Sequence, residues 1–156
     1  MSAEPFPAAS LDGPWSAPDI AEYLDGARIP VRLAKQAPDG WPGIVSLWFM
    51  RSGDQILCAT RRDARTTASL VQHPRCAFEV SGETIPYRGV RGRATVEVDD
   101  RDAEAVLTAL IVRYLGSVDT PFARWLLGRI DGEVVLRLTP VSISSWDFGE
   151  RMPAAG

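Results

Sequence analysis

The residues best suited to chemistry lie in one run, CATRRDART, at positions 58–66. A predicted strand ends in this run and a helix is expected to begin at about Asp63, so backbone N–H groups at the helix start could bind an anion. Guanidinium groups offer phosphate a planar fork of donors, and threonine hydroxyls add single donors. These donors are Thr60, Arg61, Arg62, Arg65, Thr66 and Thr67. The run predicts an anion site; the alternative is a solvated basic turn in which Asp63 only caps its helix.

Two other groups of residues could contact a ligand. In PYRGVRGR, residues 86–93, arginines point off one face of a predicted strand. They could bind a phosphate or pair across a dimer interface, and the alternative is surface ion pairing with Glu97 and its neighbours. Trp146, in the segment WDF, could stack on a planar ring or fill the core. These residue types indicate binding, and no catalytic acid, base or nucleophile is predicted.

Signatures of the common enzyme classes are absent from the sequence. It has no glycine-rich phosphate loop with Lys-Ser/Thr, no Gly-x-Gly-x-x-Gly after a strand and no Cys-x-x-Cys. With His73 as the only histidine, neither an imidazole metal site nor a Ser-His-Asp triad is expected. Cys58 and Cys76 lie in apolar runs and are predicted to be buried thiols rather than a disulfide.

Charge and hydropathy exclude further classes. The formal net charge of -3 argues against a nucleic-acid-binding protein, which needs a basic surface. No run approaches the roughly 18 apolar residues of a membrane span. The beginning, MSAEPFPAAS, has an acid and two prolines where a signal peptide needs positive charge and then an apolar run. We therefore expect a cytoplasmic protein.

The elements that position the candidate residues follow from periodicity. Residues 1–15 show no period and are rich in Pro, Ala and Ser, so a flexible N-terminal arm is expected there, and a flexible tail over 150–156. The capping box SAPD begins a short helix that Gly26 ends. IPVRLAK, IVSLWFM and ILCAT then predict three strands of a meander, the second buried on both faces.

The second half of the chain mixes strands and helices. The arginine-rich run leads into a brief helix that Pro74 ends, and CAFEV is the next strand. GVRGRATVEV alternates apolar and polar residues, and its glycines indicate a bend or a close backbone approach. Helices are predicted over 99–116 and in VDTPFARWLLGR, followed by a strand, EVVLRLTPVSISSWDF, broken at Pro140. Residues 16–149 thus predict one α+β domain with a mostly antiparallel sheet.

In this order the segments resemble the FMN-binding split barrels of the pyridoxamine 5′-phosphate oxidase-like superfamily. The likeness covers roughly residues 19–148 and lies in the series IPVRLAKQAPDGWPGIVSLWFM, ILCAT, HPRCAFEV, YRGVRGRATVEVDD, RYLG and RLTPVSISSWDF. It implies an α+β split β-barrel of mostly antiparallel strands with flanking helices. It also implies a homodimer with FMN at the subunit interface, acting as an oxidoreductase on a small organic substrate.

Transferred to this chain, the resemblance implies three groups of cofactor contacts. The flavin ring would lie along Val45, Ser46 and Leu47. Its phosphate would meet Thr60, Arg61, Arg65, Thr66 and Thr67, with Arg62 as a further candidate. Tyr87, Arg88 or Trp146 would come from the partner subunit. This phosphate end coincides with the anion site that the residue types indicate.

One position departs from the family's pattern. Many FMN-binding members carry Ser-Arg-Lys before this helix, and the matching residues here are Ala64, Arg65 and Thr66. Loss of the lysine contact costs about 1.5–3 kcal/mol unless Arg61 or Arg62 compensates. The resemblance therefore leaves open FMN or a deazaflavin as cofactor, and a non-catalytic module that binds heme or flavin is a further alternative.

Overall fold

The computed structural model describes residues 3–152 of the chain. These residues form eight strands, four α-helices and one short 3₁₀ helix, Ile130–Gly132. The strands and helices are β1 (Ser10–Asp12), α1 (Ala17–Gly26), β2 (Val31–Gln36), β3 (Pro42–Leu47), β4 (Met50–Ser52), β5 (Gln55–Arg61), α2 (Arg65–Gln72), β6 (Arg75–Ser81), β7 (Arg88–Asp99), α3 (Ala103–Leu115), α4 (Pro121–Leu127) and β8 (Glu133–Asp147).

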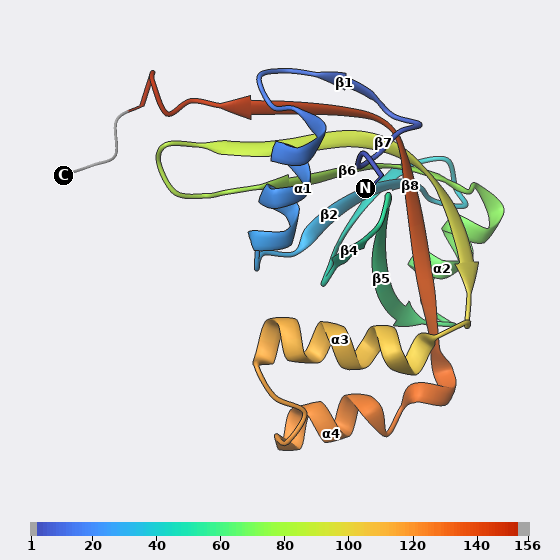
Figure 1. The fold of residues 1–156 in the computed structure, drawn as a ribbon. Helices are drawn as coiled ribbons and strands as arrows, with labels where there is room; N and C mark the ends of the chain where they lie inside the picture. The colour runs from blue at the N-terminus through green and yellow to red at the C-terminus, as the bar shows by residue number, and fades with distance from the viewer. Residues whose placement is uncertain (1–2, 153–156) are drawn as a thin grey trace.

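One curved sheet carries the fold (Figure 1). Its strand order is β3-β2-β6-β7-β8-β5-β4, all neighbours are antiparallel, and β1 adds a parallel pairing to β8. The two longest strands, β7 and β8, run side by side, and α3 and α4 stack against each other at one end of the sheet. The predicted α+β class with a mostly antiparallel sheet is confirmed.

Alternation along β7 separates the core from the outer face of the sheet. Val90, Ala94 and Val96 are buried, whereas the arginines and Glu97 between them are exposed, as the period-2 pattern predicts. A β-carbon on Gly92 would collide with the carbonyl oxygen of Ser142 and lie 2.7 Å from Cζ of Phe78. The predicted close backbone approach is therefore confirmed, since only glycine fits there.

The N-terminal arm differs from the expectation of a loose segment. Ser10–Asp12 pairs with Ser142–Ser144 of β8, and Phe6 is 3% exposed within the main core. The backbone N–H of Trp15 donates to Oγ of Ser145 at 3.1 Å. One buried aromatic and a short strand thus attach an arm whose composition alone indicates disorder. Residues 153–156 of the predicted tail lie outside the described residues.

Two expectations about strands are wrong. The run IVSLWFM does not form one strand buried on both faces, because β3 lies at the edge of the sheet and leaves Ile44 78% exposed. Pro140 does not break β8, because it lies beside a β-bulge in which Ala94 pairs with Pro140 and Arg93 with Ser142. A proline without an N–H is tolerated at such an irregularity, and the extra residue is Val141.

Candidate functional site

The junction between β5 and α2 contains the predicted anion site. Helix α2 begins with Ala64 as its N-cap, and no side chain within residues 3–152 caps it. The prediction of Asp63 as N-cap is wrong, since its side chain is 87% exposed and lies 4.0 Å from Nε of Arg61. No side chain among the described residues therefore satisfies the first-turn N–H groups of α2, and such groups at a helix start can bind an anion. The Thr67 hydroxyl donates to the carbonyl of Arg61 at 2.6 Å and fixes the turn.

Arg61 is engaged by the chain itself. Its Nη1 donates to the carbonyl oxygen of Arg129 at 2.8 Å and forms an ion pair with Oε1 of Glu133 at 3.2 Å. The guanidinium lies directly over Gly132, where a β-carbon would collide with it. Arg61 therefore ties β5 to the start of β8 through its Nη1. Sequence reasoning missed Glu133, which lies 72 positions along the chain and carries no local signal.

The other donors of the junction differ in their exposure and in whether they form an ion pair. Arg62 forms an ion pair with Asp100 at 3.2 Å, and both side chains are more than half exposed. Arg65 is exposed and has no carboxylate partner within the described part of the chain. Thr66 is 8% exposed, and Thr60 is half-buried opposite Val134. A groove of about 490 Å³ brings Arg62 and Thr67 together.

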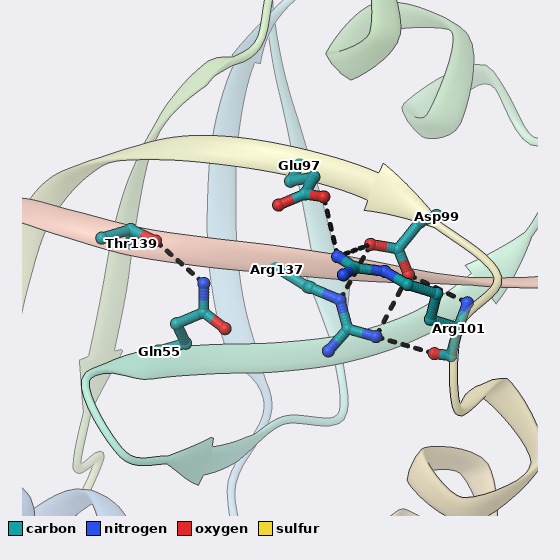
Figure 2. A network of polar contacts seen from close by, with 6 residues as sticks. All are labelled: Gln55, Glu97, Asp99, Arg101, Arg137 and Thr139. Atoms are coloured by element: carbon teal, nitrogen blue, oxygen red, sulfur yellow. Dashed lines mark hydrogen bonds and ion pairs between the residues drawn. The ribbon is translucent and has the colours of Figure 1, made fainter.

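Asp99 also lines this groove, and its charge is neutralised (Figure 2). Arg137 donates to both oxygens of this carboxylate, from Nε at 2.9 Å and from Nη2 at 3.1 Å. Arg101 adds a contact at 2.7 Å and pairs with Glu97 as well. These hydrogen bonds, above all those from Arg137, hold the pKa of Asp99 far below its usual range. The carboxylate is thus compensated where an anion would otherwise be repelled.

The residues predicted along the flavin ring lie on β3. Val45 and Leu47 are partly buried and pack against the main core, whereas Ser46 is exposed and pairs opposite Arg32 of β2. Alternation on the strand therefore places only Ser46 on the outer face, beside the exposed Ile44. The three residues therefore do not share one face; what they share is their position on β3, the strand at the edge of the sheet.

Tyr87, Arg88 and Trp146 lie together at the far end of β7 and β8. Arg88 pairs with Asp147, Gly89 with Trp146, and the N–H of Phe148 donates to the carbonyl of Tyr87 at 3.0 Å. β7 has 12 residues from this end to Asp99, a span of about 35 Å in an extended strand. One subunit therefore does not bring these residues to the β5–α2 junction.

Cys58 and Cys76 are free thiols in the main core. Burial raises the pKa of Cys76 to about 12, and burial beside Cys76 raises the pKa of Cys58 further. Within residues 3–152 no three or more His, Cys, Asp or Glu side chains are grouped to hold a metal ion. The same residues contain no helix with the length and apolar character to span a membrane.

Comparison with known proteins places this geometry in context. The model of the family described as pyridoxamine 5′-phosphate oxidase matches residues 18–147. A search of curated proteins gives no significant match.

Solved structures share the fold at low identity. A conserved hypothetical protein, Rv2991 from Mycobacterium tuberculosis, is 22% identical with a TM-score of 0.77, covering 92% of each chain. An F420 reductase is 24% identical with a TM-score of 0.67, covering 79% of this chain and 94% of its own. A FAD-binding protein from Mesorhizobium loti is 15% identical with a TM-score of 0.62, covering 84% of this chain and 93% of its own.

Proposed function

Because the chain belongs to the pyridoxamine 5′-phosphate oxidase family over residues 18–147, and has the α+β split-barrel fold of its structural neighbours, we propose that it is a flavin-dependent oxidoreductase. It acts on a small organic substrate and holds its cofactor between the two subunits of a homodimer. The observation that carries the proposal is the β5–α2 junction, where the helix start has no side-chain cap and is followed directly by an exposed Arg65 without an ion pair in residues 3–152.

The phosphate of the cofactor would be held at this junction. The fit rests on donors without a side-chain partner in residues 3–152, namely the first-turn N–H groups of α2 and the guanidinium of Arg65. Arg62 can add a contact by exchanging Asp100 for phosphate, since that ion pair is exposed and weak. Glu133 and the carbonyl of Arg129 hold Nη1 of Arg61, so this side chain is fixed in place beside the junction.

The second subunit would complete the site. Tyr87, Arg88 and Trp146 lie a full strand length from the junction of their own chain, so they reach a cofactor only at the junction of a partner. Two large apolar side chains of the β2–β3 hairpin, Trp41 and Ile44, are 73% and 78% exposed, and such an interface would cover Ile44 on the outer sheet face. Ile44 borders a groove of about 820 Å³ together with Arg32 and Arg91.

In such an enzyme the bound flavin supplies hydride or electron transfer. The residues of this chain bind and orient: the junction fixes the phosphate, and the β3 edge would lie along the ring. Arg91 holds Trp146 through a cation–π contact with its guanidinium 4.4 Å from the ring centre, so the indole is presented in a defined orientation. The free, buried thiols agree with a cytoplasmic location.

A deazaflavin is the second candidate cofactor, and Thr66 favours it. Thr66 occupies the position of the expected lysine and is 8% exposed, so it provides no cation there. FMN presents a dianionic phosphate and gains most from such a cation. The similar structures named as an F420 reductase and as a FAD-binding protein agree with a flavin-type cofactor in either case.

The substitution Arg65→Gln tests the proposed site. Loss of one charge-assisted contact is expected to weaken cofactor binding about 10- to 100-fold. The measurement is fluorescence titration of the purified protein with FMN and, separately, with F420, and the tighter ligand identifies the cofactor. Arg124→Gln, an exposed arginine of α4, is the matched control and should leave both affinities unchanged. Wild-type protein that binds neither compound would refute the proposal, as would equal affinities for wild type and Arg65→Gln.

A further inference from the structure

A second groove lies where the β2–β3 hairpin meets the start of β6 and the middle of β7. Its volume is about 570 Å³, and the bulged residue Val141 of β8 forms part of its wall. The lining residues that carry charge are Lys35, Arg75 and Arg93, and those that offer neutral polar groups are Gln36 and Thr95. Much of the remaining lining is apolar, from alanines, Pro42 and Val141.

The three cations of this groove have no acidic counterpart. No carboxylate lines the groove, and none of Lys35, Arg75 and Arg93 forms an ion pair within residues 3–152. Lys35 is also the chain's only lysine, among 17 basic residues set against 20 acidic ones. Arginines without an ion pair are common within residues 3–152, so the distinguishing feature of this groove is that three cations line it together and no carboxylate does.

The neighbouring groove on the same sheet face differs, because two of its arginines form ion pairs. There Arg91 pairs with Glu79 at 3.1 Å and Arg32 with Glu83 at 3.7 Å. Both grooves share Ala34, Ala77 and Arg93, so they differ in charge balance rather than in their place on the sheet. Like charges held together repel, and an anionic ligand between them removes that repulsion.

We propose that this groove binds a small organic anion with at least two negative charges and an apolar body. The three cations would hold its charged groups, Gln36 and Thr95 would hydrogen-bond to them, and the apolar wall would contact the carbon skeleton. Three cations in a chain of net charge -3 are too few for nucleic acid, which needs an extended basic surface.

The groove is separate from the proposed cofactor phosphate end. Arg65 begins α2, whereas Arg75 lies three residues after its end. The eight residues of α2 separate the two sites by about 12 Å. Arg75 therefore lies away from the proposed phosphate end, and the inference goes beyond the proposed function.

Calorimetric titration with benzene-1,3,5-tricarboxylate tests the groove, with benzoate as the singly charged comparison. The wild-type protein is expected to bind the tricarboxylate at least tenfold more tightly than benzoate, and added salt should weaken that binding. The double variant R75Q/R93Q should lose at least tenfold in tricarboxylate affinity. The control Arg124→Gln removes an exposed arginine on α4 and should behave as wild type.

Further measurements keep the outcome unambiguous. R75Q/R93Q should unfold at a urea midpoint no lower than that of wild type, because it removes two like charges. Arg93 also lines the groove beside Ile44, so the single variant R75Q carries the comparison with the cofactor site, and its flavin titration should match wild type. Equal binding of tricarboxylate and benzoate, or unchanged tricarboxylate affinity in R75Q/R93Q, would overturn the proposal. A change of oligomeric state in R75Q/R93Q would also overturn it, because the groove would then be a contact between copies of the chain.

Discussion

Replacing Arg137 with methionine is expected to lower the free energy of unfolding by about 3 kcal/mol, because it leaves a largely buried carboxylate without its main partner. The Arg137 and Asp99 side chains are only 11% and 17% exposed, and two hydrogen bonds join them. Arg137 also donates to the carbonyl of Arg101 at 2.7 Å, so the turn from β7 into α3 loses a second fastening. Urea unfolding followed by circular dichroism measures the loss.

Arg101→Gln is the matched control, since Arg101 contacts the same carboxylate. Its side chain is 63% exposed, so its removal should cost no more than about 1 kcal/mol. Equal losses for the two variants would show that burial does not set the strength of this network.

The contribution of the Asp99 carboxylate to stability should be lost at acidic pH. The folded-state pKa of Asp99 is depressed, so its contribution to stability is present above its unfolded pKa of about 3.9 and is lost as the pH falls below that value. Arg137→Met removes the main cause of the depression. The difference in unfolding free energy between wild type and Arg137→Met should therefore be large at pH 7 and shrink toward pH 3. A difference independent of pH would contradict this account.

Ile44→Glu is expected to separate the proposed dimer and to remove most cofactor affinity. Ile44 is 78% exposed on β3, and a carboxylate at that position would be desolvated on association. Two copies in a symmetric dimer would each carry the change, so its cost is counted twice. Because Tyr87, Arg88 and Trp146 are proposed to come from the partner, a monomer lacks half of the site.

Two measurements check this prediction. Light scattering on a size-exclusion column should give a dimer for wild type and a monomer for Ile44→Glu, and flavin titration should show at least tenfold weaker binding, as loss of several contacts requires. The control is Val112→Glu, which places the same charge on α3 at a residue that is 49% exposed. A variant Ile44→Glu that remains dimeric and binds flavin normally would show that β3 lies outside the interface.

Structural features that depend on residues close together in the sequence were predicted correctly. The Ser16–Asp19 capping box forms at the start of α1, Thr120 caps α4, and Gly116 ends α3 in the left-handed conformation with φ of 81°. Each depends on residues within a few positions of one another. The alternation of β7 was equally readable, since one face meets the core and the other meets solvent.

Features that depend on residues far apart in the sequence could not be predicted from it. Phe6 enters the core from a segment whose composition indicates disorder, and Pro140 stays within β8 because of a bulge opposite Ala94. At the candidate site, the sequence marks Arg61 as a phosphate donor, but the structure engages it with Glu133. Long-range pairing decides which arginines remain free, and a chain of 16 arginines offers many equivalent choices.

The reactivity of the two free thiols can be used to measure how often the folded protein opens. Cys58 and Cys76 lie in the same core cluster, on β5 and β6, and both are protonated and shielded in the folded state. A thiol reagent reacts only with exposed thiolate, so labelling must wait for an opening that uncovers them. Labelling rates compared with global unfolding rates would tell whether the barrel opens in parts or as one unit.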